Sequence, residues 1–269
     1  MHGKHRVAAI QLTSTDDWAN NLETAEGFIH EAADQGAELV GLPENFAFLR
    51  ADSQTTPCGQ TLDGEFLQRM ATVAQQRQLH ILCGSIPERI ADSDLIYNTS
   101  VLLGPCGDRL AVYRKIHLFD VNLPGGAVFQ ESRFVRPGNE IIVIDTRLGK
   151  IGLTICYDLR FPEIYRRLTQ AGAEIIFVPS AFTEYTGKDH WEVLLRARAI
   201  ENLAYIVAPA QYGQHNPTRR SYGKSMIIDP WGNVIARASD KPGPILAEID
   251  YDFQSKIRQE LPCLNHIRL

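Results

Sequence analysis

The sequence predicts an α/β protein, and three features of the chain support that class. Its 269 residues are enough for one large domain. A hydrophobic content of 44% and a charged content of 22% are ordinary for a globular protein. Short β-type runs alternate with helical patterns, and strands outnumber helices. No linker or repeat interrupts them, so we expect a single domain over residues 1–269, with two packed sheets and outer helices.

The first part of the chain alternates between strand and helix patterns. Residues 21–38 place Leu22, Ala25, Ile29 and Ala32 at helical spacing and end near Gly36. The turn residues of 104–108 predict a hairpin between the strands on either side. The expected strands are 6–12, 39–44, 80–88, 97–104 and 109–115, and the expected helices are 21–38 and 65–78.

The middle of the chain, residues 116–140, contains two Pro-Gly turns and shows little periodicity. A loop of this length inside a compact domain is usually functional or disordered. Because the segment carries aromatic side chains and charges of both signs, we expect an ordered, functional loop.

The alternation resumes after residue 140. Pro162 stands where it can occupy the first turn of a helix. The expected strands are 141–146, 150–156, 174–180, 205–211, 224–230, 233–239 and 244–250, and the expected helices are 162–172, 190–204 and 251–262. We expect His190 at the start of its helix, in a capping or packing role.

Composition argues against several classes of partner. The net charge of -5 lacks the basic footprint of a nucleic-acid-binding protein. No apolar stretch approaches the roughly 18 residues of a membrane helix, and the N-terminus resembles a first strand more than a signal peptide. The five cysteines, Cys58, Cys83, Cys106, Cys156 and Cys263, include no C-x-x-C pair. We therefore expect no disulfide framework and no metal site, and a reducing cytoplasm fits.

Three predicted strands end in reactive side chains: Glu44, Lys115 and Cys156. Ligands of α/β folds gather at strand ends, so these groups could converge. A carboxylate could accept the thiol proton, the thiolate could attack a carbonyl, and an ammonium could stabilise the resulting oxyanion. Taken singly, each residue is more often a solvated or core residue. The default for Cys58, Cys83 and Cys106 is a buried small hydrophobic residue.

Rival chemistries lack their residues. A Cys-His dyad would need His117 or His190 near the thiol, and neither stands in a protease-like context. The sequence contains no H-E-x-x-H, G-x-S-x-G or G-x-x-x-x-G-K-[ST] motif.

The segments LPENF (42–46), YRKIHLFD (113–120) and TICYDLRFPE (154–163) together resemble the nitrilase, or carbon–nitrogen hydrolase, superfamily. The resemblance implies that Glu44, Lys115 and Cys156 form a catalytic triad. It also implies that Glu131 is the second glutamate, which positions substrate and the other catalytic groups, and that the Tyr157 N–H is a second oxyanion donor. The implied fold is a four-layer α-β-β-α sandwich, the implied assembly is a homodimer or a higher homo-oligomer, and the chemistry needs no cofactor.

Further segments, among them TGKDHWEVLLRARAIE and the loop GQHN…RRSYG, resemble the Nit branch, which implies a small-molecule oxo-acid amide as substrate. Deaminated glutathione is the first expectation. A 2-oxoglutaramate or 2-oxosuccinamate amide is the alternative, and a nitrilase or a non-catalytic scaffold stays possible. An oxo-acid carboxylate favours an arginine fork, for which Arg160 is the candidate, unless it pairs with Asp158 or Glu163.

Two further groups of residues complete the predicted binding site. Phe182 and Thr183 follow a predicted strand and are expected to line the pocket beside Arg160. A longer substrate with a distal carboxylate would need a second cationic site. Arg219, Arg220 and His215 lie in one polar loop that could supply it, although a solvated surface loop is the alternative.

Overall fold

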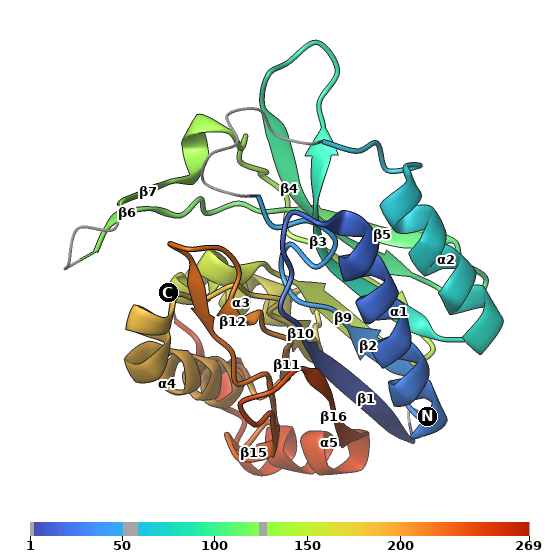
Figure 1. The fold of residues 1–269 in the computed structure, drawn as a ribbon. Helices are drawn as coiled ribbons and strands as arrows, with labels where there is room; N and C mark the ends of the chain where they lie inside the picture. The colour runs from blue at the N-terminus through green and yellow to red at the C-terminus, as the bar shows by residue number, and fades with distance from the viewer. Residues whose placement is uncertain (1–2, 51–58, 124–127, 269) are drawn as a thin grey trace.

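Two six-stranded β-sheets pack face to face, with helices on both outer surfaces, in the computed structural model of the chain (Figure 1). The structure describes residues 3–50, 59–123 and 128–268, and Cys58 lies outside them. The α-β-β-α layering confirms the expected fold class. It follows from strands whose two faces are both buried, which lets each sheet contact the other sheet on one side and helices on the other.

The first sheet has the strand order β16-β1-β2-β3-β4-β5. Strand β1 lies parallel to β2, and β2 parallel to β3, while the other neighbours are antiparallel. The strands are β1 (Lys4–Gln11), β2 (Leu39–Gly41), β3 (His80–Arg89), β4 (Ile96–Leu103), β5 (Arg109–Arg114) and β16 (Gly243–Asp250).

The second sheet repeats this pattern with the order β15-β14-β11-β10-β9-β8. Again two parallel pairs, β9–β10 and β10–β11, lie in the centre with antiparallel strands outside them. The strands are β8 (Val143–Thr146), β9 (Gly149–Leu153), β10 (Ile175–Phe177), β11 (Tyr205–Ala208), β14 (Met226–Ile228) and β15 (Val234–Arg237).

Helices cover the outer faces, and each begins where the sequence supplies a suitable first turn. The Asp17 carboxylate accepts from the Asn20 N–H at the start of α1, and Pro162 is the first residue of α3. The helices are α1 (Trp18–Asp34), α2 (Glu65–Arg77), α3 (Pro162–Gln170), α4 (Glu184–Asn202) and α5 (Tyr251–Glu260).

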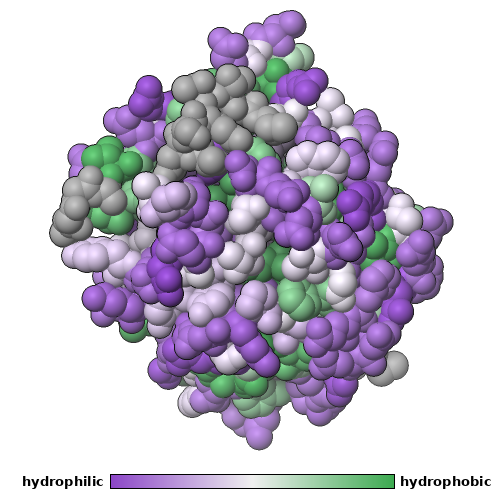
Figure 2. Space-filling model, in the orientation of Figure 1, coloured by the Kyte–Doolittle hydropathy of each residue, from purple (hydrophilic) through white to green (hydrophobic). Residues whose placement is uncertain are grey.

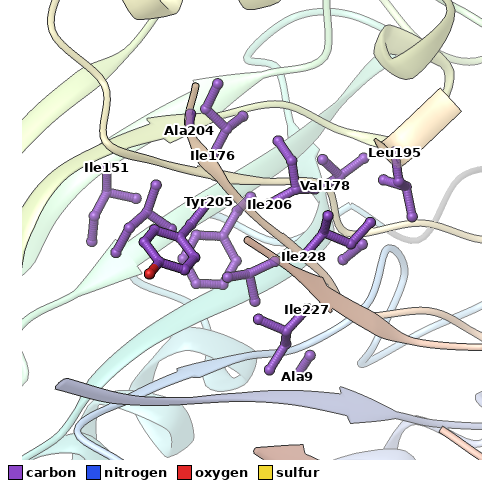
Figure 3. Close-up of a cluster of buried hydrophobic side chains, with 14 of the residues drawn as sticks. Ala9, Ile151, Ile176, Val178, Leu195, Ala204, Tyr205, Ile206, Ile227 and Ile228 are labelled. Atoms are coloured by element: carbon purple, nitrogen blue, oxygen red, sulfur yellow. The ribbon is translucent and has the colours of Figure 1, made fainter. Parts of the chain in front are cut away.

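Strand β1 shows how the core is divided. Ala8 and Ile10 pack with residues of α1 and α2, whereas Val7 and Ala9 belong to the cluster between the sheets. Figure 3 shows Ala9 close to Ile227 of β14, across the inter-sheet layer. Because side chains alternate along a strand, a strand that is apolar at every position is expected between two buried layers.

Four sequence expectations need correction. The long middle segment contains a short hairpin, β6 (Asp120–Asn122) and β7 (Val128–Gln130), followed by a 3₁₀ turn at Glu131–Arg133. The loop after β11 contains a second hairpin, β12 (Tyr212–Gln214) and β13 (Arg220–Tyr222). Helix α4 begins at Glu184, so His190 lies inside it and does not cap it. Cys106 is exposed, unlike the buried Cys83.

The surface in the orientation of Figure 1 is mostly hydrophilic, with hydrophobic side chains scattered in small patches (Figure 2). No described helix is both long and apolar enough to cross a membrane. The described residues also contain no group of three His, Cys, Asp or Glu side chains arranged to hold a metal ion.

Gly84 in β3 provides a test of the close packing beneath the site. A Cβ at this position would lie 1.9 Å from the Pro43 carbonyl oxygen, which is main chain and cannot rotate away. We expect Gly84→Ala to reduce the free energy of unfolding by about 1–3 kcal/mol, the usual cost of overpacking, as measured by urea denaturation. Gly27→Ala, in an exposed turn of α1 with nothing within 4 Å of the added Cβ, is the control. It should stabilise by about 0.5–1 kcal/mol; an equal effect of both changes would contradict this reading.

Candidate active site

One cavity of about 580 Å³ is lined by the predicted catalytic residues and by the predicted substrate-binding residues Arg160, Phe182 and Thr183, and of the three candidates for a second cationic site it includes only Arg219. Glu44 follows β2, Lys115 follows β5 and Cys156 follows β9, so the first two come from one sheet and the thiol from the other. The strands before Glu44 and Cys156 both end three residues earlier than expected, at Gly41 and Leu153. The other predicted residues in the cavity wall are Glu131, Tyr157, Arg160, Phe182 and Thr183.

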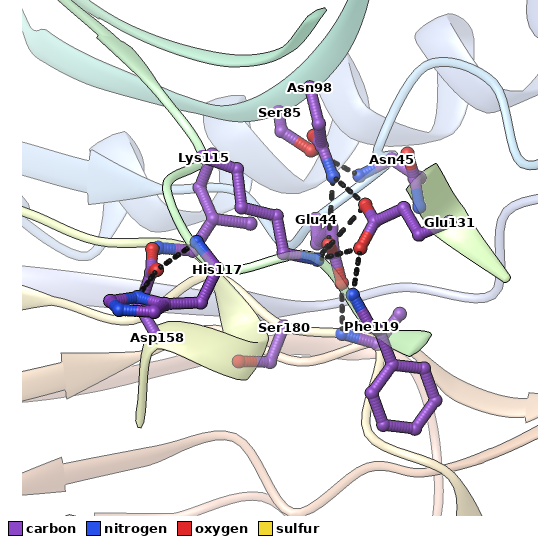
Figure 4. A network of polar contacts seen from close by, with 12 residues as sticks. Glu44, Asn45, Ser85, Asn98, Lys115, His117, Phe119, Glu131, Asp158 and Ser180 are labelled. Atoms are coloured by element: carbon purple, nitrogen blue, oxygen red, sulfur yellow. Dashed lines mark hydrogen bonds and ion pairs between the residues drawn. The ribbon is translucent and has the colours of Figure 1, made fainter. Parts of the chain in front are cut away.

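The Lys115 ammonium lies between two carboxylates (Figure 4). Its Nζ is 2.8 Å from Glu44 Oε1, and 3.1 and 2.9 Å from the two oxygens of Glu131. Lys115 is only 2% exposed. A buried charge is tolerable when its donors are satisfied by ionised partners, so the three residues form one structural unit.

Other donors fix the two carboxylates. The Asn98 side-chain amide donates to Glu44 Oε1 (2.9 Å) and to Glu131 Oε1 (3.1 Å), which ties them together. The Ala181 N–H donates to Glu44 Oε2 at 3.0 Å, and the Phe119 N–H donates to Glu131 Oε2 at 2.7 Å. Both carboxylates are therefore held in one orientation before any substrate enters.

Cys156 lies on a strained turn. Its φ is +46°, a left-handed value that costs energy for any residue with a Cβ. Its N–H donates to the Pro179 carbonyl at 2.9 Å, and a 3₁₀ turn runs from Cys156 to Arg160. The turn is thus anchored to the segment after β10, and it presents the thiol to the cavity.

Asp158 holds this turn from behind. Its carboxylate is fully buried and accepts from the Ile155 N–H (2.9 Å) and from the Tyr113 hydroxyl of β5 (2.6 Å). It also accepts from the His117 N–H at 3.0 Å and lies 2.7 Å from His117 Nδ1. Asp158 therefore joins the turn of Cys156 to the segment that follows Lys115.

The two histidines proposed as partners for the thiol have other contacts. The His117 ring stacks on Phe161 at 3.7 Å, and its Nδ1 faces Asp158. His190 is exposed, and its Nδ1 lies 3.3 Å from Arg160 Nη1. Neither contact leads to Cys156, whereas the Glu44 carboxylate accepts a hydrogen bond from the thiol.

The electrostatics give each group of the triad a defined protonation state. Burial would raise the pKa of Glu44, but Lys115 and a hydrogen bond from Cys156 outweigh it, so that pKa lies below its usual value. Burial would lower the pKa of Lys115, but Glu131 and Glu44 raise it well above the ordinary range. Burial and the Glu44 charge together raise the pKa of Cys156. The resting site therefore pairs a neutral thiol with a carboxylate and an ammonium.

Arg160 lies in an aromatic corner of the cavity. Its guanidinium is 5.3 Å from the centre of the Phe182 ring and 5.9 Å from that of Tyr157. The expected alternative was an ion pair of Arg160 with Asp158 or Glu163. Among the described residues, Arg160 forms an ion pair with neither; Asp158 pairs with His117, and Arg160 lies beside His190. Thr183, besides lining the cavity, accepts from the Thr186 N–H and so caps α4.

Asn98 and Asp158 are the site residues whose roles sequence reasoning missed. Asparagine is disfavoured inside strands, so Asn98 within an apolar strand was the available signal. Asp158, two residues after the thiol, was considered only as a partner for Arg160. The roles of the Ala181 and Phe119 N–H groups cannot be predicted from sequence, because every residue except proline carries a main-chain N–H.

Comparison with known proteins identifies the family to which the chain belongs. The family model described as carbon-nitrogen hydrolase matches residues 6–259. A protein named deaminated glutathione amidase from Synechocystis is 48% identical over 97% of both chains, and a human protein of the same name is 46% identical over 97% of this chain and 82% of its own. The solved structure of Nit3 from Saccharomyces cerevisiae, described as a member of branch 10 of the nitrilase superfamily, is 32% identical with a TM-score of 0.87, covering 97% of this chain and 95% of that one. The chain therefore belongs to the carbon-nitrogen hydrolase family, whose members are hydrolases acting on amides and related bonds.

Replacing Lys115 tests the electrostatic balance of the site. In Lys115→Met the burial of Glu44 would lose the strongest opposing effect, that of the Lys115 charge and its hydrogen bond, and only smaller contributions such as that of Arg219 would remain. The pKa of Glu44 should therefore rise above the ordinary 4.5 instead of falling below it. In the wild type the lowered pKa stabilises the fold above pH 4.5, and this contribution is lost as pH falls through the folded pKa. In the variant, stability should be lost as pH rises above 4.5. The difference in unfolding free energy should therefore grow from pH 5 to pH 8, reaching about 3–5 kcal/mol.

Urea denaturation at several pH values measures this difference. Lys4→Met is the matched control, since Lys4 pairs with Glu248 on the exposed surface, where ion pairs contribute little. A difference between wild type and Lys115→Met that stays constant with pH would show that Lys115 does not set the charge state of Glu44.

Proposed function

We propose that this protein is an amidase that hydrolyses deaminated glutathione to 2-oxoglutarate and cysteinylglycine, a metabolite-repair reaction. The observation that carries the proposal is the convergence of a protonated thiol, an ionised carboxylate and an ammonium in one arginine-lined cavity. The names of the Synechocystis and human relatives support the choice of substrate.

Glu44 acts as general base in the acylation step. Because the pKa of the Cys156 thiol is raised, the nucleophile must lose its proton during the attack, and the hydrogen-bonded Glu44 is the acceptor. The sulfur bonds to the amide carbon and the carbonyl becomes an oxyanion. When the oxyanion collapses, the C–N bond breaks and Glu44 returns the proton to the departing amine of cysteinylglycine. The product on the enzyme is a 2-oxoglutaryl thioester.

Lys115 and the Tyr157 N–H stabilise the oxyanion in this scheme. The ammonium is already oriented by Glu44 and Glu131, so little reorganisation is needed as negative charge develops. Glu131 acts by holding Lys115 in place and ionised.

Water completes the cycle. Glu44 takes a proton from a water molecule, whose oxygen attacks the thioester carbon. The thiolate leaves and is reprotonated from Glu44, which releases 2-oxoglutarate and restores the resting state. The scheme uses only side chains, main-chain N–H groups and water, and it needs no cofactor.

Arg160 is the residue proposed to bind the oxo-acid carboxylate. Its guanidinium rests on Phe182 and Tyr157 and so can present its N–H donors to an anion in the cavity. Phe182 and Thr183 would form the wall beside that anion. Since 2-oxoglutaramate and 2-oxosuccinamate carry the same carboxylate, an ω-amidase is the alternative function. Comparison of kcat/KM for deaminated glutathione and 2-oxoglutaramate decides between them, and a clear preference for 2-oxoglutaramate would overturn our choice.

The thioester provides a direct test of the mechanism. Acid quenching during turnover should leave a 2-oxoglutaryl adduct on Cys156, visible by mass spectrometry of the digested protein. Cys156→Ser should lower kcat by about 10³-fold or more, since the nucleophile is the centre of the unit. Cys106→Ser, at an exposed position, should be unaffected. An adduct on another cysteine, or normal turnover by Cys156→Ser, would overturn the mechanism.

We also propose a cytoplasmic location and a homodimer. The location is supported by dependence on a reduced thiol. The dimer is supported by an exposed apolar strip on α4 and the adjoining β14–β15 turn, made of Val193 (66% exposed), Ile200 and Trp231 (57% exposed). The two parts are contiguous, since Arg196 Nε donates to the Gly232 carbonyl at 2.8 Å. A second copy of the chain would cover this strip.

A charge placed in the strip should disrupt the dimer. We expect Val193→Lys to shift the wild-type dimer to a monomer in light scattering coupled to size exclusion, because the ammonium would be buried without a partner. Gln76→Lys, on the exposed side of α2, should leave the mass unchanged. A Val193→Lys protein that keeps the wild-type mass would rule out this interface.

A further inference from the structure

The cavity is lined by more cationic than acidic side chains. Lys115 is neutralised by Glu44 and Glu131. The remaining cations in the wall are Arg50, Arg133, Arg160 and Arg219. Three of them rest on aromatic rings, since Arg50 and Arg133 lie over Phe134 and Arg160 lies over Phe182. Arg219 differs, because its guanidinium makes no hydrogen bond, ion pair or ring contact with any other described residue.

The loop that carries Arg219 held three candidates for a second cationic site, and the structure separates them. The Arg220 guanidinium pairs with Glu184 at 2.9 Å and lies outside the cavity wall. His215 is buried, and its Nδ1 faces the Ser14 carbonyl at 2.8 Å. Burial lowers the pKa of His215 to about 4, so it is neutral near pH 7. Arg219 alone of the three lines the cavity, and its guanidinium has no ion-pair or hydrogen-bond partner among the described residues, although its charge acts at longer range on Glu44.

The main chain at Arg219 is fixed although its side chain is not paired. The Asn216 side-chain oxygen accepts from the Arg219 N–H at 2.8 Å and from the Thr218 N–H at 3.0 Å. The Arg219 carbonyl accepts from the His215 N–H at 3.0 Å. The side chain is half-buried, so its charge is partly removed from water without a protein counter-ion. Such an arrangement is favourable when a bound anion supplies the missing partner.

We propose that Arg219 forms a second anion subsite, which binds the terminal carboxylate of the leaving group of a dianionic amide substrate. The inference rests on the proposed function, and it divides the work between two arginines: Arg160 holds the oxo-acid carboxylate and Arg219 holds the glycyl carboxylate of the cysteinylglycine portion. An extended chain of two residues places that carboxylate about 7 Å from the scissile nitrogen. The two subsites together distinguish deaminated glutathione from short oxo-acid amides.

The test compares three substrates with three proteins. The substrates are deaminated glutathione, the same compound with its terminal carboxylate converted to a carboxamide, and 2-oxoglutaramate. The proteins are the wild type, Arg219→Met and Arg220→Met. Methionine keeps the apolar stem and removes the charge, and Arg220 is the matched control because it is adjacent, exposed and outside the cavity wall.

We expect the wild type to favour deaminated glutathione over the carboxamide by about 10–100-fold in kcat/KM, the range of a charge-assisted hydrogen bond. Arg219→Met should lose that factor on deaminated glutathione and stay within about 2-fold of wild type on the other two substrates. The hydrolysis rate of the isolated 2-oxoglutaryl thioester should not change, since the leaving group has already departed. Arg220→Met should match the wild type on all three substrates.

Three outcomes would overturn the inference. Equal losses by Arg219→Met on all three substrates would show a general effect on the site. An unchanged rate on deaminated glutathione would show that Arg219 does not bind its carboxylate. Slower thioester hydrolysis in Arg219→Met would place its action on the acyl group. These outcomes are distinct from failure of the proposed function, in which the wild type itself hydrolyses 2-oxoglutaramate well and deaminated glutathione poorly.

Discussion

The buried ion triplet of Glu44, Lys115 and Glu131 is the interaction on which the site depends. An ammonium that is 2% exposed would normally lose its proton or destabilise the fold. Two carboxylates prevent this, and the Asn98 amide and two main-chain N–H groups hold those carboxylates in a fixed orientation. The fold therefore positions strand ends, and the triplet turns those ends into a preorganised electrostatic environment for the thiol.

The motifs around Glu44, Lys115 and Cys156 made the three chemistry-bearing positions predictable, and the alternating apolar runs made most of the two sheets predictable. The two short hairpins were not, because their three-residue strands are largely exposed and lack the buried apolar run that marks the equally short β2, β10 and β14. The start of α4 at Glu184 was missed because Gly187, in its first turn, is a poor helix former. Glycine is required at 187 because a Cβ there would lie 2.3 Å from the Tyr222 side chain. Asn98 and Asp158 act only through tertiary contacts, and no local pattern specifies such contacts.

The substrate wall differs from the catalytic centre in how it is built. Glu44, Lys115 and Cys156 follow strands, and the Glu44 and Lys115 side chains are each held by several hydrogen bonds. Part of the cavity wall comes instead from the β6–β7 and β12–β13 hairpins, which contribute Phe129 and Arg219 among others. Loops carried on a rigid scaffold can change without disturbing the core. Under the proposed function, this division would let the same three groups act on amides of different length, with the choice made by Arg160 and Arg219.

Cys156 and Glu44, the proposed nucleophile and base, follow strands of different sheets. Glu44 and Lys115 follow β2 and β5, and Cys156 follows β9. Hydrogen bonds that join the two layers beside the site include those of Ala181 with Glu44, Tyr113 with Asp158 and His117 with Asp158. The spacing between sulfur and carboxylate is consequently a property of the apolar interface between the sheets. A substitution deep in that interface, at Ala9 or Ile227 for example, could slide one sheet against the other by a fraction of an ångström and slow the reaction without touching the cavity. The inter-sheet core would thus set the distance between the Cys156 sulfur and the Glu44 carboxylate, so its packing would matter for the reaction as well as for stability.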